Sequence, residues 1–90
     1  MVSLGSLIVA GRQATEALWA HPDDSVGRGQ VEELVARVRM EANFLGRSEM
    51  LLVCDEIGPI ANAAPTPQAV EILINGFERL ARHWRAAQPR

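Results

Sequence analysis

The stretch Ala36–Glu56, "ARVRMEANFLGRSEMLLVCDE", contains the end of one predicted helix, a tight turn and the start of another. The pair Leu45-Gly46 marks the turn, because glycine is common just past the last residue of a helix. Ser48 follows two residues after Gly46, and serine is a favourable N-cap. The stretch therefore predicts a helical hairpin in which Ser48 caps the second helix.

The helix before the turn is predicted over residues 30–45. Its apolar residues recur at spacings of three and four, the period of one face of an amphipathic helix. They are Val31, Leu34, Val35, Val38, Ala42 and Leu45. Glu32 and Glu33 fall in the first turn, where negative charge is favourable to the helix dipole. We expect one side of this helix to face a core and the other side to be exposed.

The helix after the turn is predicted over residues 48–62. Its apolar side contains Leu51, Cys54, Ile57 and Ala61, with Met50 and Val53 beside them. Proline has no N–H to donate, and its ring clashes with the preceding helical turn. We therefore expect Gly58-Pro59 to kink this helix or to end it.

Two more helices flank the hairpin, over residues 3–20 and 66–87. The first has an apolar stripe of Leu4, Leu7, Ile8, Ala14 and Leu18. Residues 21–29 contain one proline and two glycines and are predicted to be a loop. Thr66 and Pro67 combine an N-cap with a proline at the first helical position, which is a strong start signal. The stripe that follows is Val70, Leu73, Ile74, Phe77, Leu80, Ala81 and Trp84.

Four amphipathic helices with short connections and no strand alternation predict an all-α fold. The short connections favour antiparallel neighbours, and hence an up-down-up-down four-helix bundle. We expect residues 1–90 to form a single helical-bundle domain, because a chain of this length can bury one core.

Composition excludes several classes of protein. The net charge of −2 predicts neither a nucleic-acid surface nor an anionic-membrane surface. Cys54 is the only cysteine, so no internal disulfide can form, which is typical of a reducing compartment. The first residues lack the basic segment of a signal peptide, and no run of eighteen apolar residues occurs. We expect a cytoplasmic protein.

No catalytic or cofactor motif is present in the sequence. A phosphate-binding glycine loop, a serine elbow and paired zinc-binding cysteines are all missing. His21 is near Asp23 and Asp24, but a lone histidine in a proline-containing loop is expected to be solvated rather than to bind a metal. We therefore expect no enzymatic activity, no metal and no cofactor.

Charged residues on the third and fourth helices are expected to have ordinary structural roles. His83, Arg79, Arg82 and Arg85 fall near the end of the fourth helix, where positive charge is favourable to the dipole. The acidic residues of the third helix are expected to form a solvated face. They are Glu49, Asp55 and Glu56.

The hairpin resembles the histidine-containing phosphotransfer (HPt) domains of two-component phosphorelays. The resemblance lies in Ala42, Leu45-Gly46, Leu51 and the segment Cys54-Asp55-Glu56, and it extends roughly over residues 30–84. It implies a bundle with an antiparallel four-helix core, as the periodicity predicts independently. The phosphoaccepting histidine of the family corresponds to Ala36 in this chain, which has no nitrogen to phosphorylate.

The resemblance implies a degenerate HPt domain that keeps a docking surface. The family's lysine corresponds to Arg39, which retains the charge, and its glycine corresponds to Met40, which fills the reactive groove. We expect this surface to bind a receiver or histidine kinase domain without phosphotransfer, as an inhibitor, scaffold or adaptor. Its predicted residues are Ala36, Arg37, Arg39, Met40 and Asn43.

Two alternatives remain open at this point. The chain could be a small self-association or assembly subunit, using apolar residues beside or off the main stripes to form a homodimer. The residues proposed for this surface are Trp19, Ile60 and Ile72. Phosphotransfer could instead use an out-of-register histidine, either His21 or His83, although neither is followed by a basic residue three positions later.

Overall fold

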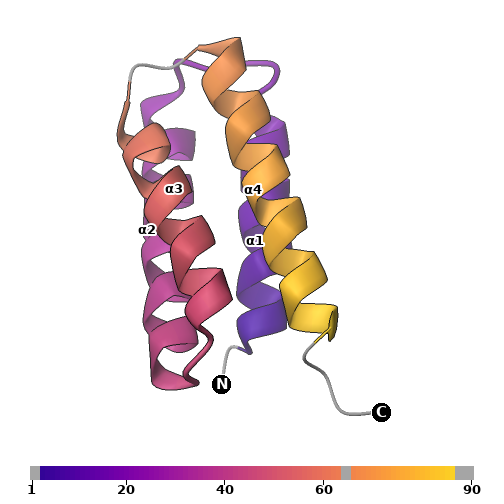
Figure 1. The fold of residues 1–90 in the computed structure, drawn as a ribbon. Helices are drawn as coiled ribbons and strands as arrows, with labels where there is room; N and C mark the ends of the chain where they lie inside the picture. Colours follow the sequence, from indigo (N-terminus) through magenta and orange to yellow (C-terminus); the bar gives the residue numbers. More distant parts are fainter. Residues whose placement is uncertain (1–2, 64–65, 87–90) are drawn as a thin grey trace.

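The computed structural model describes residues 3–63 and 66–86, and these ranges contain four α-helices. The helices are α1 (Leu4–Ala17), α2 (Ser25–Phe44), α3 (Ser48–Asn62) and α4 (Pro67–Ala86) (Figure 1). The same two ranges contain no strand. The predicted all-α fold class is confirmed.

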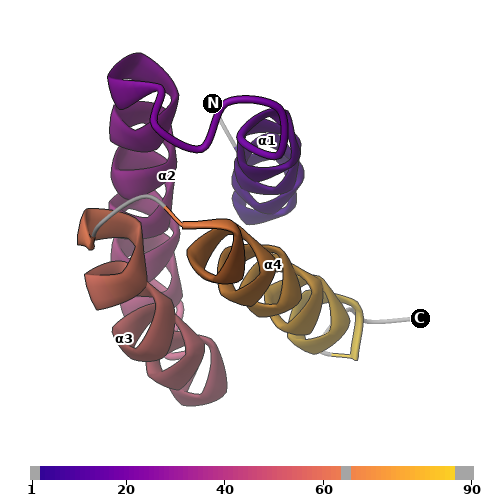
Figure 2. The same cartoon turned by 90° about the horizontal axis from the view of Figure 1, so that it is seen from above.

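The helices form a closed ring of antiparallel neighbours. Each helix runs opposite to the one before it (Figure 1), and Figure 2 shows all four around a common centre in chain order. α1 packs against α2 and α4, and α3 packs against the same two helices. The diagonal pairs make no close backbone contact within the described ranges. This arrangement is the predicted up-down-up-down four-helix bundle.

The apolar stripes of all four helices meet in one core. Its buried members include Leu7 and Ile8 of α1; Val31, Val35, Val38 and Ala42 of α2; Met50, Val53, Cys54 and Ile57 of α3; and Val70, Leu73, Phe77 and Leu80 of α4. Thr15 is the one polar residue buried with them among the described residues, and its hydroxyl donates to the Gly11 carbonyl at 2.7 Å. That intrahelical bond satisfies the hydroxyl away from water.

The turn between α2 and α3 forms as the sequence predicts, but its cap differs. Gly46 has φ 70°. Its N–H donates to the Asn43 carbonyl at 3.2 Å, and the Arg47 N–H donates to the Ala42 carbonyl at 2.8 Å, which together make a Schellman motif. The prediction of Ser48 as N-cap was wrong, because the Leu51 N–H already bonds to the Arg47 carbonyl. Arg47 is therefore the N-cap, and it makes no side-chain capping bond.

α2 begins at Ser25, five residues before its predicted start. The Asp24 carboxylate accepts a hydrogen bond from the Val26 N–H at 3.1 Å and caps the helix. Gly27 and Gly29, predicted to lie in a loop, are therefore helical. The cap and the packing of the first turn against Leu18 outweigh the helix-breaking tendency of glycine, which costs about 1 kcal/mol per residue.

The remaining boundaries of α1 and α4 show one confirmation and one correction. The Thr66 hydroxyl accepts from the Ala69 N–H at 3.1 Å, which confirms the predicted start of α4. The predicted last residue of that helix, 87, lies outside the described residues. α1 ends at Ala17 rather than at residue 20, because the next N–H groups bond three residues back and tighten the chain into a turn.

α3 continues through Pro59 to Asn62, so the helix does not end at Gly58-Pro59. The proline is exposed, and its missing N–H removes one helical bond without leaving a buried group unpaired. Continuing the helix also lets Ile60 and Ala61 pack against the core. That tertiary packing compensates for the lost bond.

None of the described helices has the length and apolar character needed to cross a membrane.

Candidate functional site

The side of α2 opposite the core carries a cluster of exposed residues that we call the α2 face. Its members are Ala36, Arg37, Met40, Asn43 and Phe44. Because the core positions of this helix are Val31, Val35, Val38 and Ala42, helical periodicity turns these five residues toward solvent. Four of the five predicted docking residues are thus exposed on this face.

Met40 and Phe44 are the two large apolar side chains of the α2 face. Met40 is 71% exposed and Phe44 is 84% exposed. They lie four residues apart, one turn along the helix, so their side chains are neighbours. Sequence reasoning missed Phe44, although its position four residues after Met40 and outside the core stripe is the signal that could have identified it.

Arg39, the fifth predicted docking residue, turns toward α3 instead. Its Nε lies 2.9 Å from Asp55 Oδ1, and both side chains remain about half exposed. The pair borders a shallow groove between α2 and α3 that Ala36 and Pro59 also line. Arg39 therefore stands at the edge of the α2 face with its charge already partnered.

The two histidines lie away from the α2 face. His21 is exposed in the connection between α1 and α2. His83 is half-buried on α4, and its Nδ1 lies 3.1 Å from Glu49 Oε2. α4 is diagonal to α2, so His83 lies on a different helix from Ala36 and away from the α2 face. The face itself carries no nucleophilic side chain.

The three residues proposed for self-association lie on three different elements. Trp19 follows α1 and is 48% exposed, and Ile72 on α4 is 46% exposed. Ile60 on α3 is half-buried and packs against the core. Of these three residues, Trp19 and Ile72 therefore have exposed side chains that a second molecule could contact.

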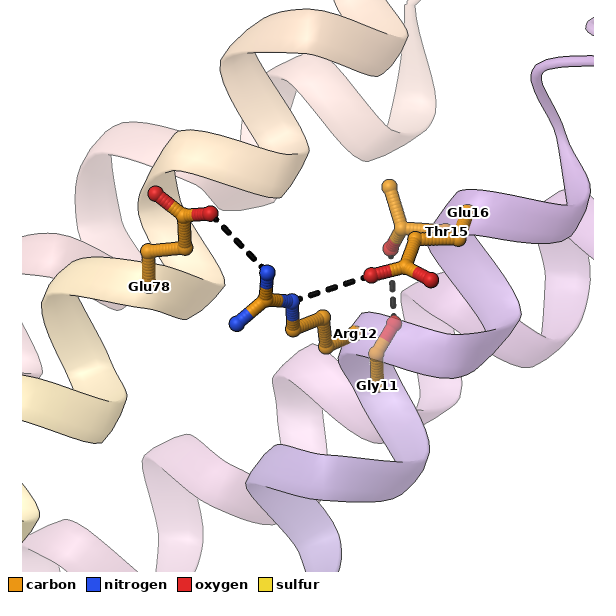
Figure 3. Close-up of polar contacts among 5 residues, drawn as sticks. All are labelled: Gly11, Arg12, Thr15, Glu16 and Glu78. Atoms are coloured by element: carbon orange, nitrogen blue, oxygen red, sulfur yellow. Dashed lines mark hydrogen bonds and ion pairs between the residues drawn. The ribbon is translucent and has the colours of Figure 1, made fainter.

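Ion pairs connect neighbouring helices around the bundle. Arg12 of α1 bonds through Nε to Glu16 Oε1 at 3.0 Å and through a terminal nitrogen to Glu78 Oε1 of α4 at 3.1 Å (Figure 3). In the same view the Thr15 hydroxyl points to the Gly11 carbonyl. Exposed pairs of this kind each contribute little to stability, about 0–1 kcal/mol.

The acidic residues of α3 were predicted to form a solvated face, and they are exposed but also paired. Glu56 accepts from Arg79 of α4, and this hydrogen bond holds the pKa of the Glu56 carboxyl below its ordinary value. Glu49 pairs with His83, and Asp55 pairs with Arg39. These residues therefore connect α3 to both of its neighbours. Arg79 was predicted to complement the dipole of α4, and it also pairs with Glu56 of α3.

Neither a reactive thiol nor a metal cluster accompanies the α2 face. Cys54 is buried, and burial together with the neighbouring Asp55 charge raises the pKa of its thiol to about 11. A thiol of that pKa is almost entirely protonated at neutral pH and is a weak nucleophile. Within residues 3–63 and 66–86, no group of three or more His, Cys, Asp or Glu side chains is placed to hold a metal ion.

Comparison with protein-family models, with curated proteins and with solved structures gives no match for this chain. The HPt resemblance therefore remains a prediction from the sequence.

Proposed function

We propose that this protein is a non-catalytic binding module that docks through the α2 face. Its partner in this proposal is a receiver or histidine kinase domain of a two-component system, which it binds as an inhibitor, scaffold or adaptor without phosphotransfer. The observation that carries the proposal is the exposure of Met40 and Phe44, side by side on a well-packed helix.

An exposed pair of large apolar side chains indicates a binding surface, because burying them against a partner lowers the free energy of the complex. Burying one such side chain fully is worth about 1.5–3 kcal/mol. Aromatic residues and methionine are also enriched in the cores of protein interfaces. Since α2 is held by packing against α1 and α3, the two side chains are presented on a rigid element and little ordering is required on binding.

Arg37 is the charged residue of the α2 face that suits an acidic partner surface. Arg37 takes part in no ion pair among the described residues, although the exposed Glu33 and Glu41 lie four residues to either side of it. Arg39 at the edge of the face is already paired with Asp55, and Arg47 follows the end of the helix. The guanidinium of Arg47 stacks over Trp84, with 5.5 Å between Cζ and the ring centroid. A receiver presents acidic residues around its phosphoacceptor, so charge complementarity supports this choice of partner. Ala36 supplies no phosphorylatable atom, which makes binding without transfer the consistent mechanism.

The first prediction tests docking directly. Titration of the ¹⁵N-labelled protein with receiver domains from the same source should shift the amide resonances of the α2 face. Phe44→Ala and Met40→Ala should each weaken binding about tenfold, because each removes an apolar contact worth roughly 1–3 kcal/mol. Incubation with a phosphorylated receiver should leave no acid-labile phosphate on His21 or His83.

Val26→Ala provides the matched control for these substitutions. Val26 lies in the first turn of the same helix and is 70% exposed, but it is far from Met40 along the helix. The control should bind receivers as the wild type does. Absence of shifts with every receiver, or equal losses in the control and the Phe44 variant, would contradict docking through the α2 face.

A further inference from the structure

The α2 face also matches a second copy of itself. We propose that two copies of this chain associate through their α2 faces, antiparallel and about a two-fold axis near Arg39-Met40. A two-fold interface requires self-complementarity, because each contact from one copy to the other occurs twice. Both the sizes and the charges of the exposed residues meet this requirement.

The size pattern along the face is small, large, large. Ala36, Met40 and Phe44 follow one another at intervals of one turn, which is about 6 Å of helix rise. In an antiparallel arrangement centred near Met40, Phe44 of each copy lies at the level of Ala36 of the other. The space beside the alanine methyl group then receives the phenyl ring, and the two Met40 side chains meet at the centre.

The charge pattern beside the face alternates in sign. Glu33, Arg37 and Glu41 are exposed and follow one another at intervals of four residues, so they lie along one side of α2. None of the three takes part in an ion pair within the described residues. Glu33 precedes Arg37 in the order that favours a pair inside a helix, and Arg37 precedes Glu41 in the less favourable order. Since neither pair forms among the described residues, Arg37 and Glu41 remain available to a partner.

A two-fold axis perpendicular to both helices brings the same flank of each copy together. Arg37 of one copy then lies opposite Glu41 of the other, and the symmetry repeats this ion pair. Pairing Arg37 with Glu41 places the two-fold axis at residue 39, the midpoint of 37 and 41. Placing Phe44 opposite Ala36 puts the axis at residue 40, the midpoint of 36 and 44, so the two positions differ by one residue. This agreement between two independent patterns favours a second copy as the occupant of the face.

The dimer has a consequence for the proposed function. A second copy and a receiver would compete for Met40 and Phe44, so self-association would regulate docking. That consequence rests on the proposed function, whereas the dimer itself does not. Dimerisation is measured without any receiver, and receiver binding is measured at protein concentrations below the dimer dissociation constant, so either can fail alone.

Sedimentation equilibrium over micromolar to millimolar concentrations, combined with charge exchange, tests the dimer. The wild type should show a reversible monomer–dimer equilibrium. Arg37→Glu places two carboxylates opposite each other at both symmetric sites, and Glu41→Arg places two guanidiniums there. Each change should lower the association constant about tenfold or more. The double variant Arg37→Glu/Glu41→Arg should recover association.

A mixture of the Arg37→Glu and Glu41→Arg variants gives the most direct test of the proposed charge pairing. Every Arg37→Glu chain is then opposite a Glu41→Arg chain with complementary charges at both sites, so the mixture should form heterodimers although each variant alone is monomeric. Phe44→Ala should weaken the dimer, and Val26→Ala should not. Thermal unfolding at low concentration controls for folding. A wild type that stays monomeric, or a mixture that does not associate, overturns the proposal, as does a dimer that responds to Trp19→Ala or Ile72→Ala but not to charge exchange.

Discussion

At the scale of single residues, Cys54 gives the structure a clear pH signature. Its thiol has a raised pKa of about 11 in the folded protein, against an ordinary value of 9.0. Between these values the unfolded chain carries a thiolate while the folded chain keeps the proton. The unfolded state therefore binds fewer protons, and stability falls as the pH rises. The stabilising contribution is complete below about pH 9 and is lost as the pH passes through about 11.

We predict that the free energy of unfolding of the wild type decreases between pH 9 and pH 11, and that Cys54→Ala is nearly flat over this interval. The chain contains no tyrosine and no lysine, so no other side chain titrates there. Urea unfolding at pH 8, 9, 10 and 11 measures both curves. The alanine variant should be less stable below pH 9 by about 1 kcal/mol, because a smaller side chain leaves a void. Parallel curves for the two proteins would show that Cys54 is not the responsible group.

At the scale of elements, Gly29 and Gly46 show two different effects of glycine, one within α2 and one just past its C-terminal end. Gly46 ends the helix with a positive φ, whereas Gly29 lies within the helix. A Cβ atom at either position would meet no neighbouring atom within 4 Å, so only the backbone distinguishes them. An L-residue in the left-handed conformation costs about 1–2 kcal/mol, while alanine inside a helix is about 1 kcal/mol better than glycine.

We therefore predict opposite effects for the same substitution at these positions. Gly46→Ala should lower the free energy of unfolding by about 1 kcal/mol, and Gly29→Ala should raise it by up to about 1 kcal/mol. Denaturant titrations followed by circular dichroism measure both. Destabilisation by Gly29→Ala would mean that residues 25–29 are not helical in solution and that α2 starts near its predicted position.

At the scale of the whole molecule, two glycines set how closely the helices approach. A Cβ atom at Gly11 of α1 would overlap the Phe77 ring of α4, and one at Gly76 of α4 would overlap Ile57 of α3. Phe77 is fully buried in the core, so its ring is enclosed by other side chains. α4 packs against both α1 and α3. These two close approaches therefore set the distances between α4 and its two neighbouring helices.

We predict that Gly11→Ala destabilises the protein by about 1–2 kcal/mol, despite the better helix propensity of alanine. Overpacking of a core typically costs about 1–3 kcal/mol and exceeds the propensity gain of about 1 kcal/mol. Gly29→Ala is the control, since it makes the same propensity change where space is free. The double variant Gly11→Ala/Phe77→Leu should lose less stability than the sum of its single changes. Additive losses would argue against contact between the two residues.

Much of this fold follows from sequence because its signals are local. The spacing of apolar residues determines which segments are helical, and Thr66-Pro67 and Gly46 fix two helix ends through their own backbone and side-chain chemistry. Short connections between four such helices then favour antiparallel neighbours. The start of α2 depends instead on its cap and on packing against another helix, so local propensity misplaced it. The predicted bounds of α3, 48–62, match the structure, and of the two expected effects of Gly58-Pro59 only the end of the helix is excluded.

The composition of the candidate site illustrates the same division. Helical periodicity alone determined that Ala36, Arg37, Met40 and Asn43 share an outward side of α2. The same periodicity places Phe44 beside Met40, although the prediction from the sequence omitted it. Only the tertiary structure decided that Arg39 turns to Asp55. The physical reason is that a period of 3.6 residues fixes which side chains lie together on one helix, whereas the rotation of that helix against its neighbours decides which of them remain uncovered.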